Sequence, residues 1–268
     1  MLRRLIDDAG LFPPARLAMP DAVAAHLATR SGPYADLVGR FLLPASLLDE
    51  FDEALPITFT GGPVQVGLIA DQGVDALRAT LDWASDPAFD VVLFEVPAPS
   101  SDPKVVEDTI ARLAGLGDAF VELPRTKGWV DHLPRNLAAV RRAGFGAKLR
   151  TGGLTADAFP TEAEVAEFIA AAVRAEVGFK LTAGLHNALR HTDPTTRFEH
   201  HGFLNVALAA AKPDEAERWL AERDGQVIAD QIRVIDSPLV RSRWQAFGSC
   251  SIDEPVEDLV TLGLLERP

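Results

Sequence analysis

The sequence has a single cysteine, a single tyrosine and only two methionines among its 268 residues. Because Cys250 has no partner in the chain, an internal disulfide framework is excluded and a reducing compartment is expected. No apolar run reaches the length of a transmembrane helix. The two arginines of the N-terminal stretch MLRRLIDDAGLFPPA are not followed by the apolar region of a signal peptide. We therefore expect a soluble, cytoplasmic protein without a membrane partner.

Positive charge is also scarce. The chain carries 26 Lys and Arg against 39 Asp and Glu, which gives a formal net charge of -13 at pH 7. This balance argues against a protein that binds nucleic acids or anionic membranes through its general charge. A hydrophobic fraction of 47% is ample for a large core. Since no linker with a shift in composition divides residues 1–268, we expect a single domain.

Short apolar runs alternate with helical patterns through the first two thirds of the chain. Six such runs begin near residues 38, 64, 90, 119, 146 and 177. They are apolar on both faces, as strands buried in a parallel sheet are. No G-x-G-x-x-G fingerprint follows the first run, which weakens a dinucleotide-binding interpretation. The pattern predicts an α/β fold of the (β/α)8 TIM-barrel type.

The two ends of the chain follow this alternation of strand and helix patterns less closely. Residues 1–35 are expected to be an irregular segment because Gly and Pro interrupt them, apart from a helix that begins near Asp21. After Gly184 the alternation fails, so the barrel is expected to be irregular around its seventh strand. We place that strand at 231–235 and the eighth at 246–252, with helices over 203–211, near 239–244 and over EPVEDLVTLGLL.

Charged side chains gather at the ends of the predicted strands, where such barrels hold their chemistry. Glu95 and Glu122 end two neighbouring strands, and Lys148 and Lys180 lie on the next two. Opposite charges at this spacing would form a ring in the lumen that keeps each group ionised or prepares one lysine for proton transfer. The alternative is that these pairs only satisfy one another. With His186, these four residues are our candidate catalytic groups.

Glycine-rich loops and further cations beside these strands indicate a site for an anion. Backbone N–H groups of small residues can form an anion-binding nest, and the last strands of barrels often hold a phosphate. The alternative is that these glycines only turn the chain, and that Cys250 is a buried, inert thiol. The expected substrate-binding residues are Arg40, Arg150, Thr151, Gly152, Gly153, Thr182, Arg190, His201, Asn205, Ser249 and Cys250.

Four of the six histidines lie between residues 185 and 203. A metal site needs two or three converging ligands, and this segment has no known ligand spacing such as HExxH. Solvated loop histidines are the commoner outcome, so we expect neither a metal nor another cofactor. His186 and His201 are instead assigned to acid–base or substrate-binding roles, because histidine titrates near neutral pH.

Six segments distributed along the chain form a specific set: DAGLFPPA, GRFLLPAS, KLRTGG, KLTAGLHNALR, HGFLNVALAAA and FGSCSIDEPVEDL. Together they resemble a family of uncharacterised bacterial barrel proteins. The resemblance spans most of the chain and implies a TIM barrel, but it implies no activity.

A second resemblance is to class I aldolases of the deoxyribose-phosphate type. The sixth strand of those enzymes carries a Schiff-base lysine before Thr, Ser, Thr and Gly, and a companion lysine lies on the seventh strand. The segment GFKLTAG places Lys180 in a similar position, with the small polar run reduced to Thr182. Its companion would be Lys148 on the fifth predicted strand. The resemblance implies a lysine in the lumen that reacts with a carbonyl compound.

The leading hypothesis is an enzyme, a lyase or isomerase, that acts on a small anionic carbonyl compound with a phosphate or carboxylate group. Lys180 would form a Schiff base or polarise the carbonyl as a cation. The first alternative is a metal-dependent hydrolase or lyase that uses the segment from His186 to His201 with Glu95 or Glu122. The second is a barrel that binds a metabolite without turning it over. The segment DAGLFPPA would plug the base of the barrel, pack over its mouth, or mediate a homodimer.

Overall fold

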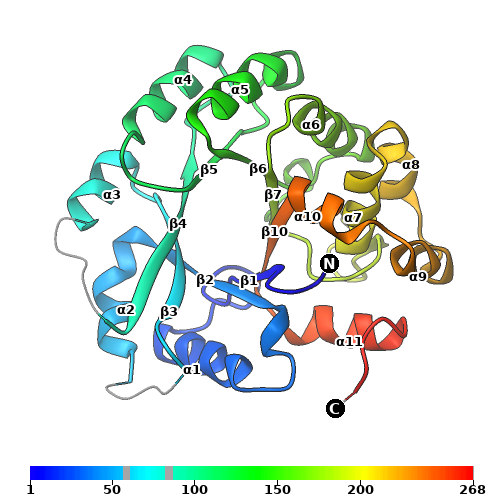
Figure 1. Cartoon of the computed structure of the whole chain (residues 1–268), viewed down its shortest axis with the longest axis horizontal. Helices are drawn as coiled ribbons and strands as arrows, with labels where there is room; N and C mark the ends of the chain where they lie inside the picture. The colour runs from blue at the N-terminus through cyan, green and yellow to red at the C-terminus, as the bar shows by residue number, and fades with distance from the viewer. Residues whose placement is uncertain (57–60, 82–86, 268) are drawn as a thin grey trace.

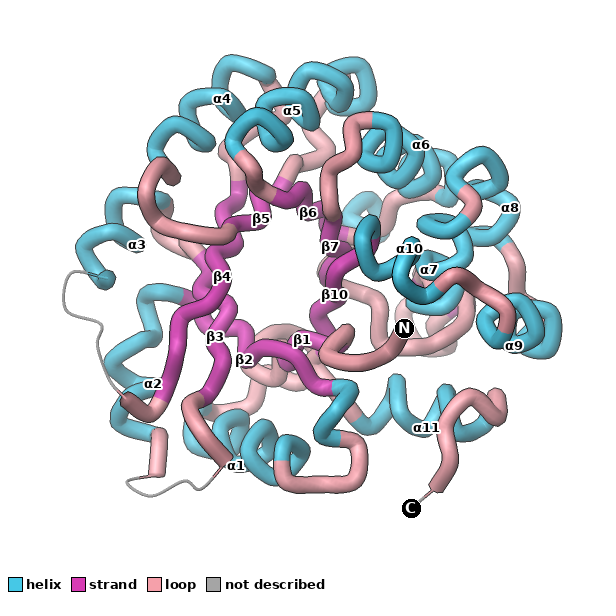
Figure 2. The backbone as a smooth tube through the Cα atoms, in the orientation of Figure 1, coloured by secondary structure: helices cyan, strands magenta, loops and turns pink. Residues whose placement is uncertain are grey.

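Eight parallel strands close into a barrel, and helices surround it (Figures 1 and 2). The structure is a computed structural model that describes residues 1–56, 61–81 and 87–267. The predicted (β/α)8 fold is confirmed. Around the barrel the strands follow the order β1, β2, β3, β4, β5, β6, β7 and β10, with β10 paired to β1. Their bounds are β1 Ile6–Asp8, β2 Val38–Pro44, β3 Val64–Ile69, β4 Phe89–Pro97, β5 Ala119–Glu122, β6 Gly146–Arg150, β7 Phe179–Thr182 and β10 Trp244–Ser249.

The first barrel strand lies in the segment that was expected to be irregular, so that prediction is wrong for β1. Ile6–Asp8 forms parallel ladders with β2 on one side and β10 on the other, and all three of its residues are buried. Three residues are too few to show a periodic pattern, which is why the strand was missed. The rest of DAGLFPPA follows the C-terminal end of β1, and the Ala9 N–H donates to the Ser249 carbonyl at 2.7 Å.

The strand predicted at 231–235 does not exist, because these residues belong to a helical region. Helix α9 spans Gly225–Arg233, and the Asp224 side chain caps it by accepting hydrogen bonds from the N–H groups of Gln226 and Val227. Such a cap satisfies amide groups that the first turn of a helix leaves open. The buried Ile228 faces the core. Of the residues predicted as a strand, 231–233 therefore belong to an amphipathic helix, and 234–235 follow its end in a turn.

Eleven α-helices lie outside the barrel strands in the described part of the chain. Capping residues fix where several of these helices begin. Thr161 and Glu164 form a reciprocal capping box at the start of α6, and the Asp102 side chain caps α4. The helices predicted over 203–211, near 239–244 and at the C-terminus are confirmed as α7, α10 and α11. The bounds are α1 Met19–Arg30, α2 Leu48–Ala54, α3 Val74–Leu81, α4 Pro103–Arg112, α5 Trp129–Ala143, α6 Glu162–Arg174, α7 Phe203–Ala211, α8 Ala216–Ala221, α9 Gly225–Arg233, α10 Ser237–Arg243 and α11 Asp253–Thr261.

The irregularity expected late in the barrel takes the form of extra helices between β7 and β10. A small hairpin of β8 (His191–Thr192) and β9 (Glu199–His200) comes first, and α7 to α10 follow. Helix α7 is almost wholly apolar and buried, and Phe203 stacks on Phe247 of β10 with ring centroids 5.0 Å apart. No helix in the described residues is both long and apolar enough to span a membrane.

Candidate functional site

The ammonium group of Lys180 lies in the barrel between two carboxylates. Its Nζ is 2.5 Å from Asp7 Oδ2 and 2.5 Å from Glu95 Oε1, and the side chains of all three residues are fully buried. Lysine, aspartate and glutamate are rarely buried unless they are paired, because removing a lone charge from water is costly. The three strands β1, β4 and β7 thus meet at one charge cluster in the lumen.

Lys148 extends this cluster toward the mouth of the barrel. Its Nζ lies 2.5 Å from the second oxygen of Glu95 and 2.9 Å from Glu122 Oε2. In the sheet, Lys148 is in register with Lys180 on β7 and with Glu122 on β5, which brings their side chains onto the same face. The predicted arrangement of two glutamates beside two lysines is confirmed. Glu95 bridges both lysines.

Asp7 completes the arrangement on the other side and was not predicted. Its Oδ1 accepts the backbone N–H of Arg40 at 2.9 Å, and its Oδ2 lies 3.1 Å from the Arg40 guanidinium. A β-carbon on Gly39 would stand 2.4 Å from Asp7 Oδ1, so only glycine leaves room for this carboxylate. A continuous series of alternating charges therefore runs through the lumen. In order it consists of Arg40, Asp7, Lys180, Glu95, Lys148 and Glu122.

The pairing holds Glu95 and Lys148 in their charged forms. Burial alone would raise the pKa of Glu95, but Lys148 and Lys180 lower it to about 2. Burial alone would lower the pKa of Lys148, yet Glu95 and Glu122 raise it above its usual value. The Lys148 ammonium is therefore stable at neutral pH, and it acts as a buried cation.

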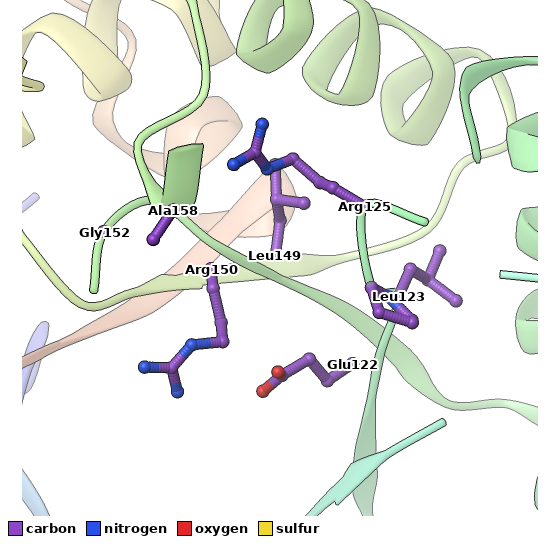
Figure 3. Close-up of a pocket in the computed structure, with 8 residues that line it drawn as sticks. Glu122, Leu123, Arg125, Leu149, Arg150, Gly152 and Ala158 are labelled. Carbon is purple, nitrogen blue, oxygen red and sulfur yellow. The ribbon is translucent and has the colours of Figure 1, made fainter. Parts of the chain in front are cut away.

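A cavity of about 180 Å³ opens beside Glu122 at the C-terminal ends of β5 and β6. Glu122 and Arg150 extend to the same side of these strands, whereas Arg125 extends away from them (Figure 3). Arg125 is held by Glu164 and by the carbonyl of Asp157. The side chain of the exposed Arg150 has no ion pair or hydrogen bond within the described residues. The lining residues are Glu122, Leu123, Pro124, Arg125, Leu149, Arg150, Gly152 and Ala158.

The loop after β6 places an open backbone donor in the wall of this cavity. The Thr151 N–H donates to the Thr182 carbonyl on β7 at 2.8 Å. The N–H of Gly152, a residue that lines the cavity, comes next along the chain. It has no hydrogen-bond partner in the described part of the chain. Gly153 is exposed beside Ala158 and does not line the cavity.

The remaining predicted residues of the last strands form a second cluster at the mouth. His186 Nδ1 lies 3.2 Å from Ser249 Oγ, 3.4 Å from Cys250 Sγ and 3.8 Å from Glu254. Burial lowers the pKa of His186 to about 4, with further contributions from His200 and His191. Burial also raises the pKa of the Cys250 thiol. The cluster is a neutral imidazole beside a neutral thiol at pH 7, and it shares no contact with the buried lysines.

The lowered pKa of His186 predicts a loss of stability in mild acid. The unfolded chain takes up a proton near the usual pKa of 6.5, whereas the folded protein does so only near 4. The contribution is complete above pH 6.5 and is lost as the pH falls to 4, by up to about 3 kcal/mol. Urea unfolding at several pH values should show this fall, and His186→Gln should flatten it. Parallel curves for the two proteins would contradict the assignment.

Three predicted binding residues lie in a third cluster, apart from the lumen. Arg190 pairs with Glu162 at 2.7 Å and with Glu199 at 3.1 Å. His201 Nε2 lies 2.8 Å from the Pro160 carbonyl, and Asn205 accepts the Arg190 N–H at 2.9 Å. Each of the three is buried with its polar groups engaged. The structure brings them together with one another and not with Lys180, so their role in substrate binding stays a prediction.

The histidine segment does not assemble a metal site from the residues that the structure describes. No group of three or more His, Cys, Asp or Glu side chains there is placed to hold a metal ion. His191 and His200 face one another across the β8–β9 hairpin with ring centroids 5.1 Å apart. Glu95 and Glu122, the other expected ligands, are committed to the lysines. The metal-dependent hypothesis stays a prediction, without an assembled ligand set among the described residues.

Comparison with known proteins does not assign the chain to a protein family. Neither a scan against protein-family models nor a search of curated proteins finds a match for this chain. The class is therefore defined by the fold and the lumen alone. It is a (β/α)8 barrel in which two lysines are buried among three carboxylates below a cavity at the C-terminal mouth.

Proposed function

We propose that the protein is a lyase or isomerase that removes a proton next to the carbonyl group of a small anionic compound. The observation that carries this proposal is the position of Lys148. Its ammonium is paired with Glu122, a residue that lines the cavity. Arg150, whose guanidinium is unpaired among the described residues, extends to the same side as that carboxylate (Figure 3). A cation, a carboxylate and an anion-binding group are thus combined at one opening, at the end of the barrel where such folds hold their chemistry.

Lys148 supplies the electrophile in this proposal. An ammonium has three N–H donors, and Glu95 and Glu122 accept two of them. The third would donate to the carbonyl oxygen of the substrate. Glu122 would then take the proton from the carbon next to the carbonyl. The electron pair of the broken C–H bond moves to the oxygen, and the fixed cation stabilises the enolate that forms.

The buried groups below act as positioning residues. Glu95 binds both lysines, and Asp7 holds Lys180 from the other side. Glu95, Lys180 and Asp7 lie on different strands of a closed sheet. Their mutual contacts therefore fix Glu95, and Glu95 holds the Lys148 ammonium in place when that ammonium loses contact with Glu122. Such preorganisation lowers the cost of stabilising the enolate.

The resemblance to class I aldolases rests on Lys180 in the sequence, but the strand numbering of the barrel transfers the analogy to Lys148. With Ile6–Asp8 as the first strand, Lys148 lies on the sixth strand of the barrel and Lys180 on the seventh. These are the strands that carry the two lysines of the aldolases. A Schiff base on Lys148 is therefore the second candidate. The raised pKa of Lys148 favours the cationic role over it.

A panel of phosphorylated and carboxylated aldehydes and ketones tests the function. Conversion of at least one of them, followed by NMR, is expected. The reaction is repeated with borohydride, which traps a Schiff base as a stable adduct on the lysine. The cationic mechanism predicts conversion without an adduct, whereas an adduct on Lys148 selects the Schiff base. Binding of several compounds without any turnover would instead support the metabolite-binding barrel.

Arg150→Gln is expected to weaken binding of the anionic substrate. The guanidinium is unpaired among the described residues and offers a planar pair of donors to a carboxylate or phosphate. Loss of one charge-assisted interaction should raise KM about tenfold or more and change kcat less. Arg125→Gln is the matched control, because Arg125 lines the same cavity but is held by Glu164. Equal effects of the two variants would contradict the assignment.

A further inference from the structure

The N-terminal end of the barrel carries two guanidinium groups near one carboxylate. Arg40 is the third residue of β2, and Arg241 lies in α10, which ends immediately before β10 begins. Both residues are therefore at the end of the barrel opposite to the cavity. Figure 1 shows α10 beside the start of the chain at this end. Electrostatic interactions link Arg241 to Asp7 and to Arg40.

The guanidinium group of Arg241 does not use all of its hydrogen-bond donors. Its Nη1 is buried and has no hydrogen-bond partner among the described residues. A buried donor on a charged group that makes no hydrogen bond costs free energy. Burial accordingly lowers the pKa of Arg241, an effect that Asp7 opposes and Arg40 reinforces.

Asp7, the carboxylate that interacts with Arg241, cannot neutralise it, because its oxygens are already bound to other groups. Asp7 Oδ2 accepts from Lys180 and lies 3.1 Å from Arg40, and Oδ1 accepts the Arg40 backbone N–H. The Arg40 side chain is 27% exposed, and Arg241 is half-buried apart from its buried Nη1, so both residues lie partly at the surface. A local excess of positive charge thus exists in a protein of net charge -13.

We propose that Arg241 and Arg40 bind a small oxyanion at the N-terminal end of the barrel. The planar donors of a guanidinium match the oxygens of a phosphate or carboxylate group, and two guanidinium groups beside one carboxylate carry one positive charge that a second anion can neutralise. The anion would satisfy Arg241 Nη1 and share Arg40 with Asp7. This site is separate from the cavity at the other end and does not depend on the proposed reaction.

Calorimetric titration of the full chain with inorganic phosphate, sulfate, acetate and glycerol phosphate tests the site. We expect phosphate to bind, and Arg241→Gln to weaken it about tenfold or more. Arg142→Gln removes the same charge from the end of α5 and should bind like the wild type. Arg150→Gln should retain the binding event that Arg241→Gln loses, which separates this site from the cavity. Binding of the ester as well as phosphate identifies the ligand as an organic phosphate; binding of phosphate alone identifies the free ion.

Three results would overturn the proposal: no binding of any of the anions, equal binding by wild type and Arg241→Gln, or a loss that occurs only in Arg150→Gln. A thermal unfolding series guards against a folding defect. Arg241→Met should be at least as stable as the wild type without phosphate, since it removes an unsatisfied cation, and phosphate should no longer stabilise it. If Arg241→Met is much less stable with and without phosphate, Arg241 is a packing residue and the site does not exist.

Discussion

Replacement of Glu95 by glutamine is expected to lower the free energy of unfolding by about 3–5 kcal/mol. Glu95 is the only carboxylate in the described structure that binds both buried lysines, at 2.5 Å each. Glutamine keeps the shape but removes the charge. It therefore leaves an excess cation in a part of the lumen that water does not reach, and this uncompensated charge is what costs free energy.

Urea unfolding measures this loss, with Glu167→Gln as control, because Glu167 forms a half-exposed pair with Arg174. The control should change little. The pKa of Glu95 is lowered from 4.5 to about 2 by folding. Its contribution is thus complete above pH 4.5 and is lost as the pH falls through 2. Glu95→Gln should lack this acid-dependent step. A variant as stable as the wild type at pH 7 would contradict the charge assignment.

Replacement of Lys148 by methionine is expected to slow turnover by about 10²–10³-fold or more. Methionine fills similar space but provides no positive charge for the developing enolate. The matched variant is Lys148→Arg, which keeps the charge and moves it. It should fold and still lose much of the rate, because the donor no longer meets the carbonyl oxygen in the same geometry.

Circular dichroism confirms that both variants are folded before their rates are compared. A structural role alone would predict that Lys148→Arg retains the wild-type rate once the protein is folded. Equal rates for wild type and a folded Lys148→Met would contradict the electrophilic role of this lysine.

The charge arrangement could be predicted because it follows from local rules. Lys148 and Lys180 each lie within a short, buried apolar run, and Glu95 and Glu122 end two others. In parallel strands these ends meet at one edge of the sheet, so proximity follows from the repeat alone. The ion-pair partner of each charged side chain does not follow from the repeat. It depends on strand register and tilt, and these brought Glu95 between the two lysines.

Asp7 was missed because its strand is only three residues long and is followed by a segment rich in Gly and Pro. A signal was nevertheless present. A closed (β/α)8 barrel needs eight strands, and only seven runs besides the weak one at 231–235 carried a strand pattern. The buried pair Leu5 and Ile6 directly before Asp7 was the remaining candidate.

Sequence patterns can also assign a binding role to residues whose polar groups are already paired within the protein, as for Arg190, His201 and Asn205. Their residue types suit a binding site, but the sequence does not reveal that Glu162, Glu199 and backbone carbonyls satisfy them. These partners come from a helix, a hairpin and distant loops, and only the packed chain brings them together. A polar residue in a loop is therefore a weaker indication of function than one at a strand end.

The central claim is that Lys148 and Glu122 together remove a proton next to a carbonyl group. Solvent-deuterium exchange tests this most directly, because it requires no knowledge of the product. The panel compounds are incubated in D2O, and NMR follows the C–H signal next to the carbonyl. We expect the wild-type protein to exchange this hydrogen in at least one anionic compound, and Glu122→Gln to do so about 100-fold more slowly or less. Exchange at the same rate in both proteins, or in neither, would contradict the account.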